Sequence, residues 1–206
     1  MNNGLGRRIA SVALMTGLTA APLVAQTPDQ SNFAARGTEL GGSIGTAFAS
    51  SETAPVVAGM AGWSITRWVT LEARGGWFAR GSNTNGVGAD VGALVNVIAR
   101  RRTTPYVGAA FGLYRASIDT RTAHVSDFYR MRMLEPAGGA TSMRTFTDPA
   151  WRFSAGVDLI RHRNISIRPE ASVVLVHRNG STDSITSVGV RLGYLFEDRP
   201  VTPTVR

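Results

Sequence analysis

The chain has 206 residues, with 22 Lys and Arg against 14 Asp and Glu, a formal net charge of +8 and no cysteine. The lack of cysteine excludes a disulfide framework and thiolate metal sites. The positive charge is a weak indication of nucleic-acid binding, because the chain has arginine but no lysine, the arginines are spread along it, and no nucleic-acid motif gathers them.

The first 25 residues are typical of a secretory signal peptide. Arg7 and Arg8 precede an apolar run over 9–18, and a cut is expected after Ala25. A membrane anchor would need about 20 apolar residues, and this run is shorter. Residues 26–38 are then expected to form an N-terminal periplasmic segment, and residues 197–206 a polar C-terminal tail.

Eight segments of alternating apolar and polar residues lie between these two ends. Each has about ten residues or a little more, which is the length that a tilted strand needs to cross a bilayer. In the third segment, for example, Val69, Leu71 and Trp77 share one face, whereas Glu72 and Arg74 share the other. The segments are 39–49, 56–65, 68–79, 87–99, 105–117, 150–161, 165–178 and 184–196.

The connections between these segments alternate between longer and short. With an even number of strands, the two kinds lie at opposite ends of a barrel, as in outer-membrane barrels with short periplasmic turns and longer extracellular loops. The sequence therefore predicts an all-β fold, an eight-stranded antiparallel up-and-down transmembrane β-barrel over residues 39–196. The longer connections are 50–55, 80–86, 116–149 and 179–183, and the short ones are 66–67, 100–104 and 162–164.

Alternation alone does not say which face meets water, since a soluble periplasmic carrier of the lipocalin type has the same period with its apolar face inward. Two features favour lipid outside. The polar face is mostly Gly, Ala and Ser between its charges, and aromatic residues gather near the segment ends, as expected for rings at the lipid headgroups. The predicted aromatic girdles are Phe48, Trp63, Trp68, Trp77, Tyr106, Tyr114, Trp151, Tyr194 and Phe196.

The charged residues of the polar face are expected to pair inside the barrel. An eight-stranded barrel has an interior just wide enough for side chains, so buried charges there need partners. The predicted ion-pair network of the lumen consists of Glu72, Arg74, Asp90, Arg152, Asp158, Arg168, Glu170 and Arg191.

Several stretches, taken in order, resemble the small OmpA/OmpX-like outer-membrane barrels of the porin superfamily. The resemblance implies a place in the outer membrane, contact with its lipids and lipopolysaccharide, and assembly by the barrel-assembly machinery through an aromatic-ended last strand. It does not fix an activity. The stretches are 62–63, 67–72, 105–109, 156–159, 165–170 and 189–196.

The connection over 116–149 is the candidate recognition element, because it combines aromatic and basic groups suited to anionic lipopolysaccharide or a partner surface. A loop that binds nothing is an equal alternative. We therefore expect a non-enzymatic barrel, structural or surface-interacting, with no cofactor and no metal; the oligomeric state stays open. The candidate contacts are His124, Phe128, Tyr129, Arg130 and Arg132.

A lipid-modifying enzyme of the lipid A deacylase type is the alternative from another class. Such barrels use a His, a Ser and an acid on the outer surface, and here His177, Ser181 and Asp183 lie near the end of the seventh segment. Those enzymes place the Ser two residues after the His, so that both side chains share a face. That position is Asn179 in this chain, which disfavours the alternative.

Overall fold

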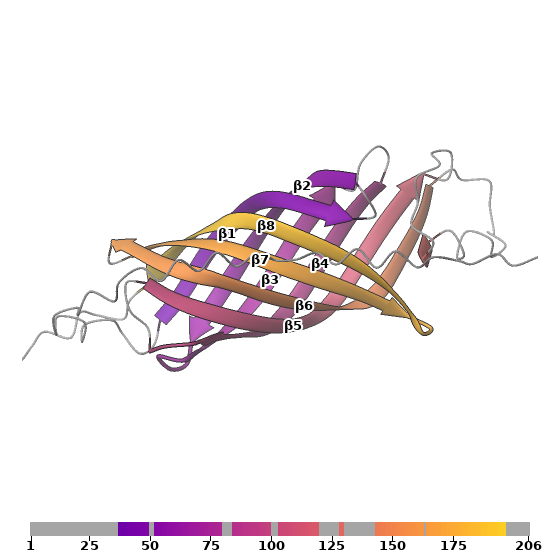
Figure 1. Cartoon of the computed structure of the whole chain (residues 1–206). Coiled ribbons are helices and arrows are strands. Elements are labelled where there is room, and N and C mark those ends of the chain that lie inside the picture. Colours follow the sequence, from indigo (N-terminus) through magenta and orange to yellow (C-terminus); the bar gives the residue numbers. More distant parts are fainter. Residues whose placement is uncertain are drawn as a thin grey trace, which may run out of the picture. The chain divides into compact units, whose positions relative to one another are not determined.

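The computed structural model describes residues 37–49, 52–79, 84–99, 103–119, 128–129, 143–162 and 164–196. Each strand pairs antiparallel with the next, and the last pairs with the first, so that the sheet closes into one barrel (Figure 1). This confirms the predicted fold class. The strands are β1 (Gly37–Ala49), β2 (Glu52–Ser64), β3 (Val69–Ala79), β4 (Thr84–Asn96), β5 (Thr103–Asp119), β6 (Met143–His162), β7 (Ile165–Arg178) and β8 (Ser181–Phe196).

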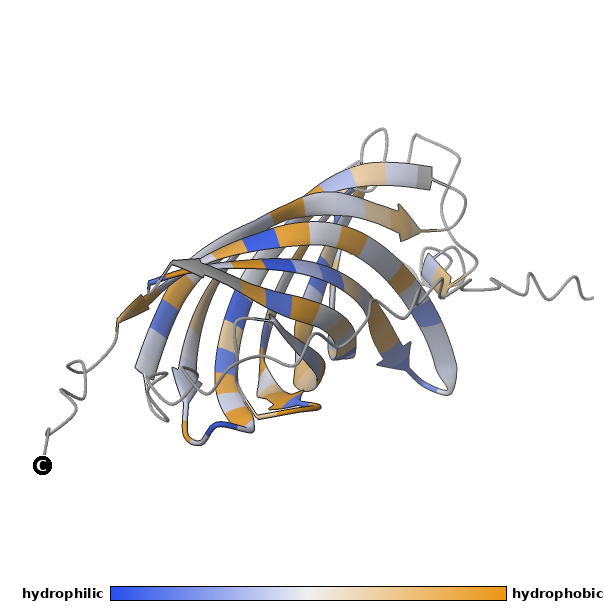
Figure 2. Cartoon of the chain, turned by 60° about the vertical axis from the view of Figure 1, so that its left-hand side comes forward, coloured by the Kyte–Doolittle hydropathy of each residue, from blue (hydrophilic) through white to orange (hydrophobic). Residues whose placement is uncertain are grey.

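The alternation of the sequence becomes the inside and outside of the barrel. On β2, Val56 and Ala58 are buried, whereas Val57 and Trp63 between and beyond them are exposed. Figure 2 shows apolar residues interrupted by polar ones along the strands. Successive side chains of a strand point to opposite faces, so one register decides the side of every residue.

Inward glycines allow the sheet to curve tightly around a narrow lumen. Gly45 of β1 lies opposite Gly189 of β8, where the barrel closes. A Cβ on either glycine would overlap the backbone of the other strand. Glycines at inward positions allow the strands of a barrel to bend and approach closely. These two glycines therefore make the pairing of β1 with β8 sterically possible.

The two ends of the barrel differ as predicted. The connections 65–68, 97–102 and 163–164 lie at one end, here called the turn end, and the connections 50–51, 80–83, 120–142 and 179–180 lie at the other, the loop end. All four loop-end connections are shorter than predicted, because the strands continue farther at the loop end than the sequence indicated.

The long connection is 120–142 rather than 116–149. β5 and β6 stay paired from Ala116 and Phe146 out to Asp119 and Met143. Ala116 and Ile118 are buried, so the apolar inward face of β5 continues and holds the hairpin together. Pro149, the last residue of the predicted connection, lies on the exposed outer face of β6.

The connection between β7 and β8 is only two residues long, not five. Asn179 and Gly180 have φ values of 47° and 80°. A two-residue hairpin turn with positive φ at both positions is type I′, which Asn-Gly favours. β8 therefore begins at Ser181 and includes Asp183.

The predicted signal peptide over 1–25 and the polar tail over 197–206 lie outside the described residues, as do residues 26–36 of the predicted periplasmic segment. β1 begins at Gly37, two residues before the predicted start of the barrel. Within the described ranges, no helix is long and apolar enough to cross a membrane.

Two glycines of β4 should respond differently to the same substitution. A Cβ on Gly86 would overlap the ring of Tyr114, whereas a Cβ on Gly88 would lie 3.5 Å from Phe78 and 3.7 Å from Tyr114, which are ordinary contacts. Gly86→Ala should therefore lower the free energy of unfolding by about 1–3 kcal/mol through overpacking. Gly88→Ala should leave it unchanged or raise it by about 0.5–1 kcal/mol, because alanine restricts the unfolded chain more than glycine.

The measurement is urea unfolding of both variants in detergent micelles, followed by tryptophan fluorescence. Gly88→Ala serves as the matched control on the same face of the same strand. Equal midpoints for the two variants would show that Tyr114 is not held against Gly86.

Candidate functional site

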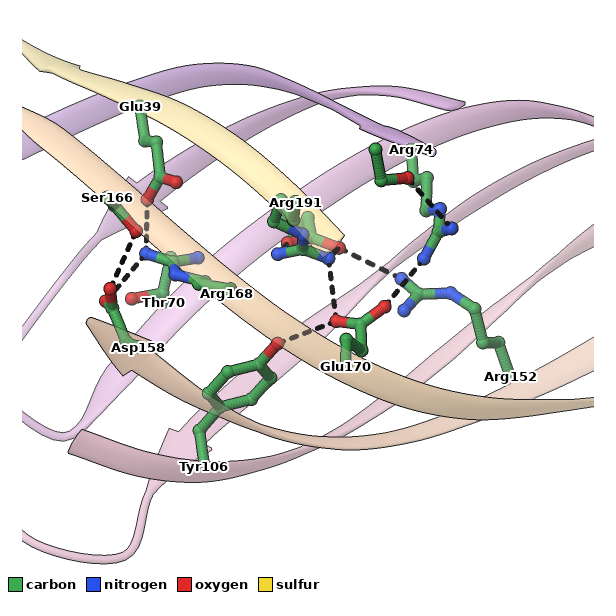
Figure 3. Close-up of polar contacts among 12 residues, drawn as sticks. Glu39, Thr70, Arg74, Tyr106, Arg152, Asp158, Ser166, Arg168, Glu170 and Arg191 are labelled. Carbon is green, nitrogen blue, oxygen red and sulfur yellow. Dashed lines mark hydrogen bonds and ion pairs between the residues drawn. The ribbon is translucent and has the colours of Figure 1, made fainter. Parts of the chain in front are cut away.

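Two groups of charged side chains lie inside the barrel, on the inward faces of six strands (Figure 3). The group nearer the turn end, here called the inner cluster, consists of Glu39, Asp158, Ser166 and Arg168. The larger group, the central layer, consists of Glu72, Arg74, Asp90, Arg152, Glu170 and Arg191.

Glu72 is the centre of the central layer. Its carboxylate accepts hydrogen bonds from Arg191 of β8 and from Arg152 of β6, the latter at 3.0 Å. Arg152 also binds Asp90 of β4, with nitrogen to oxygen distances of 2.8, 3.1 and 3.2 Å. One guanidinium group therefore bridges two carboxylates, which is the planar, multidentate geometry that arginine favours.

Glu170 of β7 joins the remaining members. It pairs with Arg74 at 2.9 Å and with Arg191 at 3.0 Å, and the hydroxyl of Tyr106 donates to it at 2.8 Å. Arg74 also donates to the hydroxyl of Ser43 at 3.3 Å. The central layer thus has three carboxylates and three guanidinium groups, so its charge is balanced where the surroundings supply no bulk water.

In the inner cluster, one arginine lies between two carboxylates. Arg168 pairs with Asp158 at 2.9 Å and with Glu39, and the hydroxyl of Ser166 donates to Asp158 at 2.6 Å. The guanidinium carbon of Arg168 is 5.9 Å from the ring centre of Tyr106, within the range of a cation–π contact. Because its hydroxyl binds Glu170, Tyr106 connects the two charged groups.

All eight residues predicted for the lumen lie inside the barrel and take part in these pairs. Sequence reasoning missed Glu39 and Tyr106. Glu39 has the same parity as Gly41 and Ser43 on the inward face of β1, a signal that was present in the sequence. Its partner Arg168 is 129 residues away, and no local pattern indicates that pairing.

The loop-end half of the lumen is mainly apolar, although the buried carboxylates Asp148 and Asp183 also lie there. Its buried apolar side chains form one cluster with Tyr129 of the long connection. Between this cluster and the central layer, the cavity that Arg74, Asp90 and Arg152 line has a volume of about 20 Å³. That volume accommodates about one water molecule. The cluster consists of Ala47, Val56, Phe78, Tyr114, Ala116, Ile118, Tyr129, Ala150, Val174, Val176 and Ile185.

The predicted girdles need one correction. Tyr106 and Tyr114 are 2% and 1% exposed, so they fill the lumen and do not face lipid. The ring of each packs over an inward glycine, since a Cβ on Gly156 would overlap Tyr106 and a Cβ on Gly86 would overlap Tyr114. The other seven predicted residues are exposed on the outer face: Phe48, Trp63, Trp68, Trp77, Trp151, Tyr194 and Phe196.

The candidate contacts of the long connection also need a correction. Tyr129 is 1% exposed and packs with Phe128 and Phe146 at ring-centre distances of 4.8 and 5.8 Å. A ring buried in the mouth of the barrel does not offer a contact surface, so Tyr129 acts as an anchor. His124, Arg130 and Arg132 lie outside the described residues.

The structure does not bring the deacylase candidates together. His177 faces outward, and its Nδ1 lies 3.0 Å from the hydroxyl of Thr182, its neighbour on β8. Asp183 is buried on the inward face of β8, and Ser181 is the register partner of Arg178 in the β7–β8 ladder. His177, Ser181 and Asp183 therefore do not lie on one face, as the deacylase alternative would require. Over the described ranges, no three His, Cys, Asp or Glu side chains are placed to hold a metal ion.

No family model and no curated protein match the sequence. Solved structures do match. The fold is similar to that of neisserial surface protein A (NspA), with a TM-score of 0.56 and 13% identity over 79% of this chain and 98% of that chain. Ail, the attachment invasion locus protein of Yersinia pestis, has a TM-score of 0.48 and 9% identity over 78% and 97%.

The outer membrane enzyme PagL is also similar, with a TM-score of 0.43 and 12% identity over 75% of this chain and 97% of that chain. The likeness to NspA shows the fold, which is the eight-stranded barrel of small bacterial outer-membrane proteins, as the sequence resemblance indicated.

Proposed function

We propose that this protein is a non-enzymatic β-barrel of the outer membrane, with a structural or surface-interacting role. One observation carries the proposal: the outer face of the barrel exposes large apolar side chains on strand after strand, while the ion-paired charges of the central layer and the inner cluster lie inside. Ile44 is 69% exposed, Val91 64% and Leu113 57%. Soluble monomers rarely expose a continuous apolar surface larger than a few hundred Å², and a barrel that displays one all around fits a lipid environment.

The distribution of side chains argues against a soluble carrier. A lipocalin-type barrel needs an apolar cavity inside and a polar outside. Here Glu72, Arg152 and Arg191 are at most 5% exposed in the lumen, whereas Leu192, beside Arg191, is 57% exposed on the outside. The faces are thus inverted relative to a carrier.

A closed lumen supports a structural role rather than a conduit. The inner cluster, the central layer and the apolar cluster follow one another along the lumen, and the cavity between the last two holds about one water. We therefore expect no steady conductance when the purified barrel is placed in a planar lipid bilayer.

The decisive experiment combines two measurements on the membrane-extracted protein. A band that shifts on boiling in SDS gels, together with retention in the membrane pellet after carbonate extraction, is the expected result. Extraction into the soluble fraction without a shift would contradict the membrane assignment. Release of fatty acid from lipid A by the parent protein, lost in His177→Ala, would replace the non-enzymatic proposal with the deacylase alternative.

A further inference from the structure

The dipeptide Asn-Gly occurs twice in the described part of the chain, in two different surroundings. Asn179 and Gly180 form the two-residue turn between β7 and β8, and both are exposed. Asn85 and Gly86 lie inside β4, where each is paired with β3 on one side and with β5 on the other. An asparagine followed by glycine is prone to lose its side-chain amide, so its surroundings decide whether it reacts.

This reaction needs only the chain and water. The backbone nitrogen of the glycine loses its proton and attacks Cγ of the asparagine side chain, and the side-chain nitrogen leaves as ammonia. The resulting succinimide ring is opened by one water molecule at either of its two carbonyl carbons, which gives aspartate or isoaspartate. The reacting atoms belong to neighbouring residues, so proximity favours the attack. Glycine permits the backbone rotation that the ring requires and has no side chain in the way.

The amide of Gly180 is available for this attack. The last register pair of the β7–β8 ladder is Arg178 with Ser181, so the two turn residues lie outside the ladder. In a type I′ turn the two flanking residues hydrogen-bond to each other, and the amide of the second turn residue points into solvent. A Cβ on Gly180 would lie in open space. The side chain of Asn179 and water therefore have free access to this amide.

Other asparagines lack such an amide. Gly86 is buried and paired with both neighbouring strands, so its amide belongs to the sheet and is not free to attack Asn85. Asn96 is followed by Val97, whose amide donates to the carbonyl of Pro105 at 2.9 Å. The side chain of Asn96 also donates to a turn carbonyl at 2.9 Å. The fold thus distinguishes the turn from the strands.

We propose that Asn179 is a site of spontaneous deamidation, through which the loop end of the barrel acquires a new carboxylate after folding. The new negative charge lies next to Arg178, whose guanidinium pairs with Asp148 at 3.1 Å while 45% of its side chain is exposed. The isoaspartate form also adds a methylene to the backbone of a turn that needs two residues of defined φ. The rest of the β7–β8 ladder holds the strands together, so the change is confined to the tip of the hairpin and the barrel stays closed.

The test follows both Asn-Gly sites in one sample. The full mature chain is folded in detergent, checked for its gel shift on boiling, and kept for several days in mildly alkaline buffer. Protease digestion and mass spectrometry then give the converted fraction at each asparagine. Asn179 should react at least about tenfold faster than Asn85, which corresponds to a cost of about 1.4 kcal/mol or more for freeing Gly86 from the sheet. The matched control is the same chain unfolded in urea, where the two rates should be equal.

Equal conversion of Asn85 and Asn179 in the folded barrel would overturn the inference, because the dipeptide and not the fold would then set the rate. An Asn179 that stays unconverted in the folded barrel while it reacts in urea would overturn it as well, since the turn would then protect the residue. Isoaspartate among the products is the expected sign of the succinimide route. Aspartate alone would mean direct hydrolysis by water and would contradict the attack by Gly180.

Discussion

Replacement of Glu72 by Gln is expected to lower the free energy of unfolding of the barrel by about 3–5 kcal/mol, the cost of removing one partner from a buried ion pair. Glu72 binds both Arg152 and Arg191, and all three side chains are at most 5% exposed. Without its charge, three arginines would share two carboxylates in the central layer. Urea unfolding and refolding of the two proteins in lipid vesicles measure the difference.

A double variant separates the charge from the shape of the side chain. Glu72→Met/Arg191→Met removes one charge of each sign and leaves the pairs of Arg74 with Glu170 and of Arg152 with Asp90. It should therefore unfold at a higher urea concentration than Glu72→Gln. If the effects of the two single substitutions on the free energy of unfolding were additive in the double variant, the balance of charge would not be what stabilises the layer.

Ser43→Ala, which removes one hydroxyl contact of Arg74 at 3.3 Å, should lower the free energy of unfolding by about 1 kcal/mol or less.

Val91→Arg is expected to destabilise the barrel by about 2–4 kcal/mol in a bilayer, because an arginine near the middle of the lipid-facing surface must leave water. Val91 lies at the middle of β4 and is 64% exposed on the outer face. The measurement is the unfolding free energy in vesicles of phosphatidylcholine.

Asn85→Arg provides the control on the same face of the same strand. Asn85 lies near the loop end of β4, where the cost of an arginine falls to about 0–1 kcal/mol. A Val91→Arg protein as stable as Asn85→Arg would mean that this surface meets water, and the soluble alternative would regain support.

The number, order and faces of the strands could be predicted because one period-two pattern repeats in every segment. The alternation in β3 is enough to assign its two faces. The structure has Val69, Leu71 and Trp77 on the outer face, and Glu72 and Arg74 on the inner face. The residues at which the strands begin and end were harder to predict. Toward the loop end the outer positions of β6 include Thr145 and Thr147, so the contrast between the two faces fades even though pairing continues.

Two features could have been predicted from signals in the sequence. They are the turn at Asn179 and Gly180, and the inward position of the tyrosines of β5. Asn-Gly between alternating segments is a strong hairpin signal, and it indicates a two-residue connection. Tyr106 and Tyr114 have the parity of Gly112, opposite to that of Phe111 and Leu113, so alternation alone assigns them to the lumen. Nearness to a segment end was a weaker criterion than parity.

The choice of partners inside the lumen could not be predicted. Alternation says that Glu72 and Arg191 both point inward, but it does not say that they meet. Their contact depends on how far each strand is shifted along its neighbours around the whole barrel, and this shift accumulates over strands whose registers the sequence pattern does not specify.

The central layer also constrains the order of events during assembly. Its six members come from β3, β4, β6, β7 and β8, and the contacts of Glu72 join residues 80 and 119 positions apart. An open sheet inserted strand by strand would bring these charges into the lipid before their partners arrive, which is costly. Closing β1 against β8 and neutralising the charges of the lumen are therefore coupled.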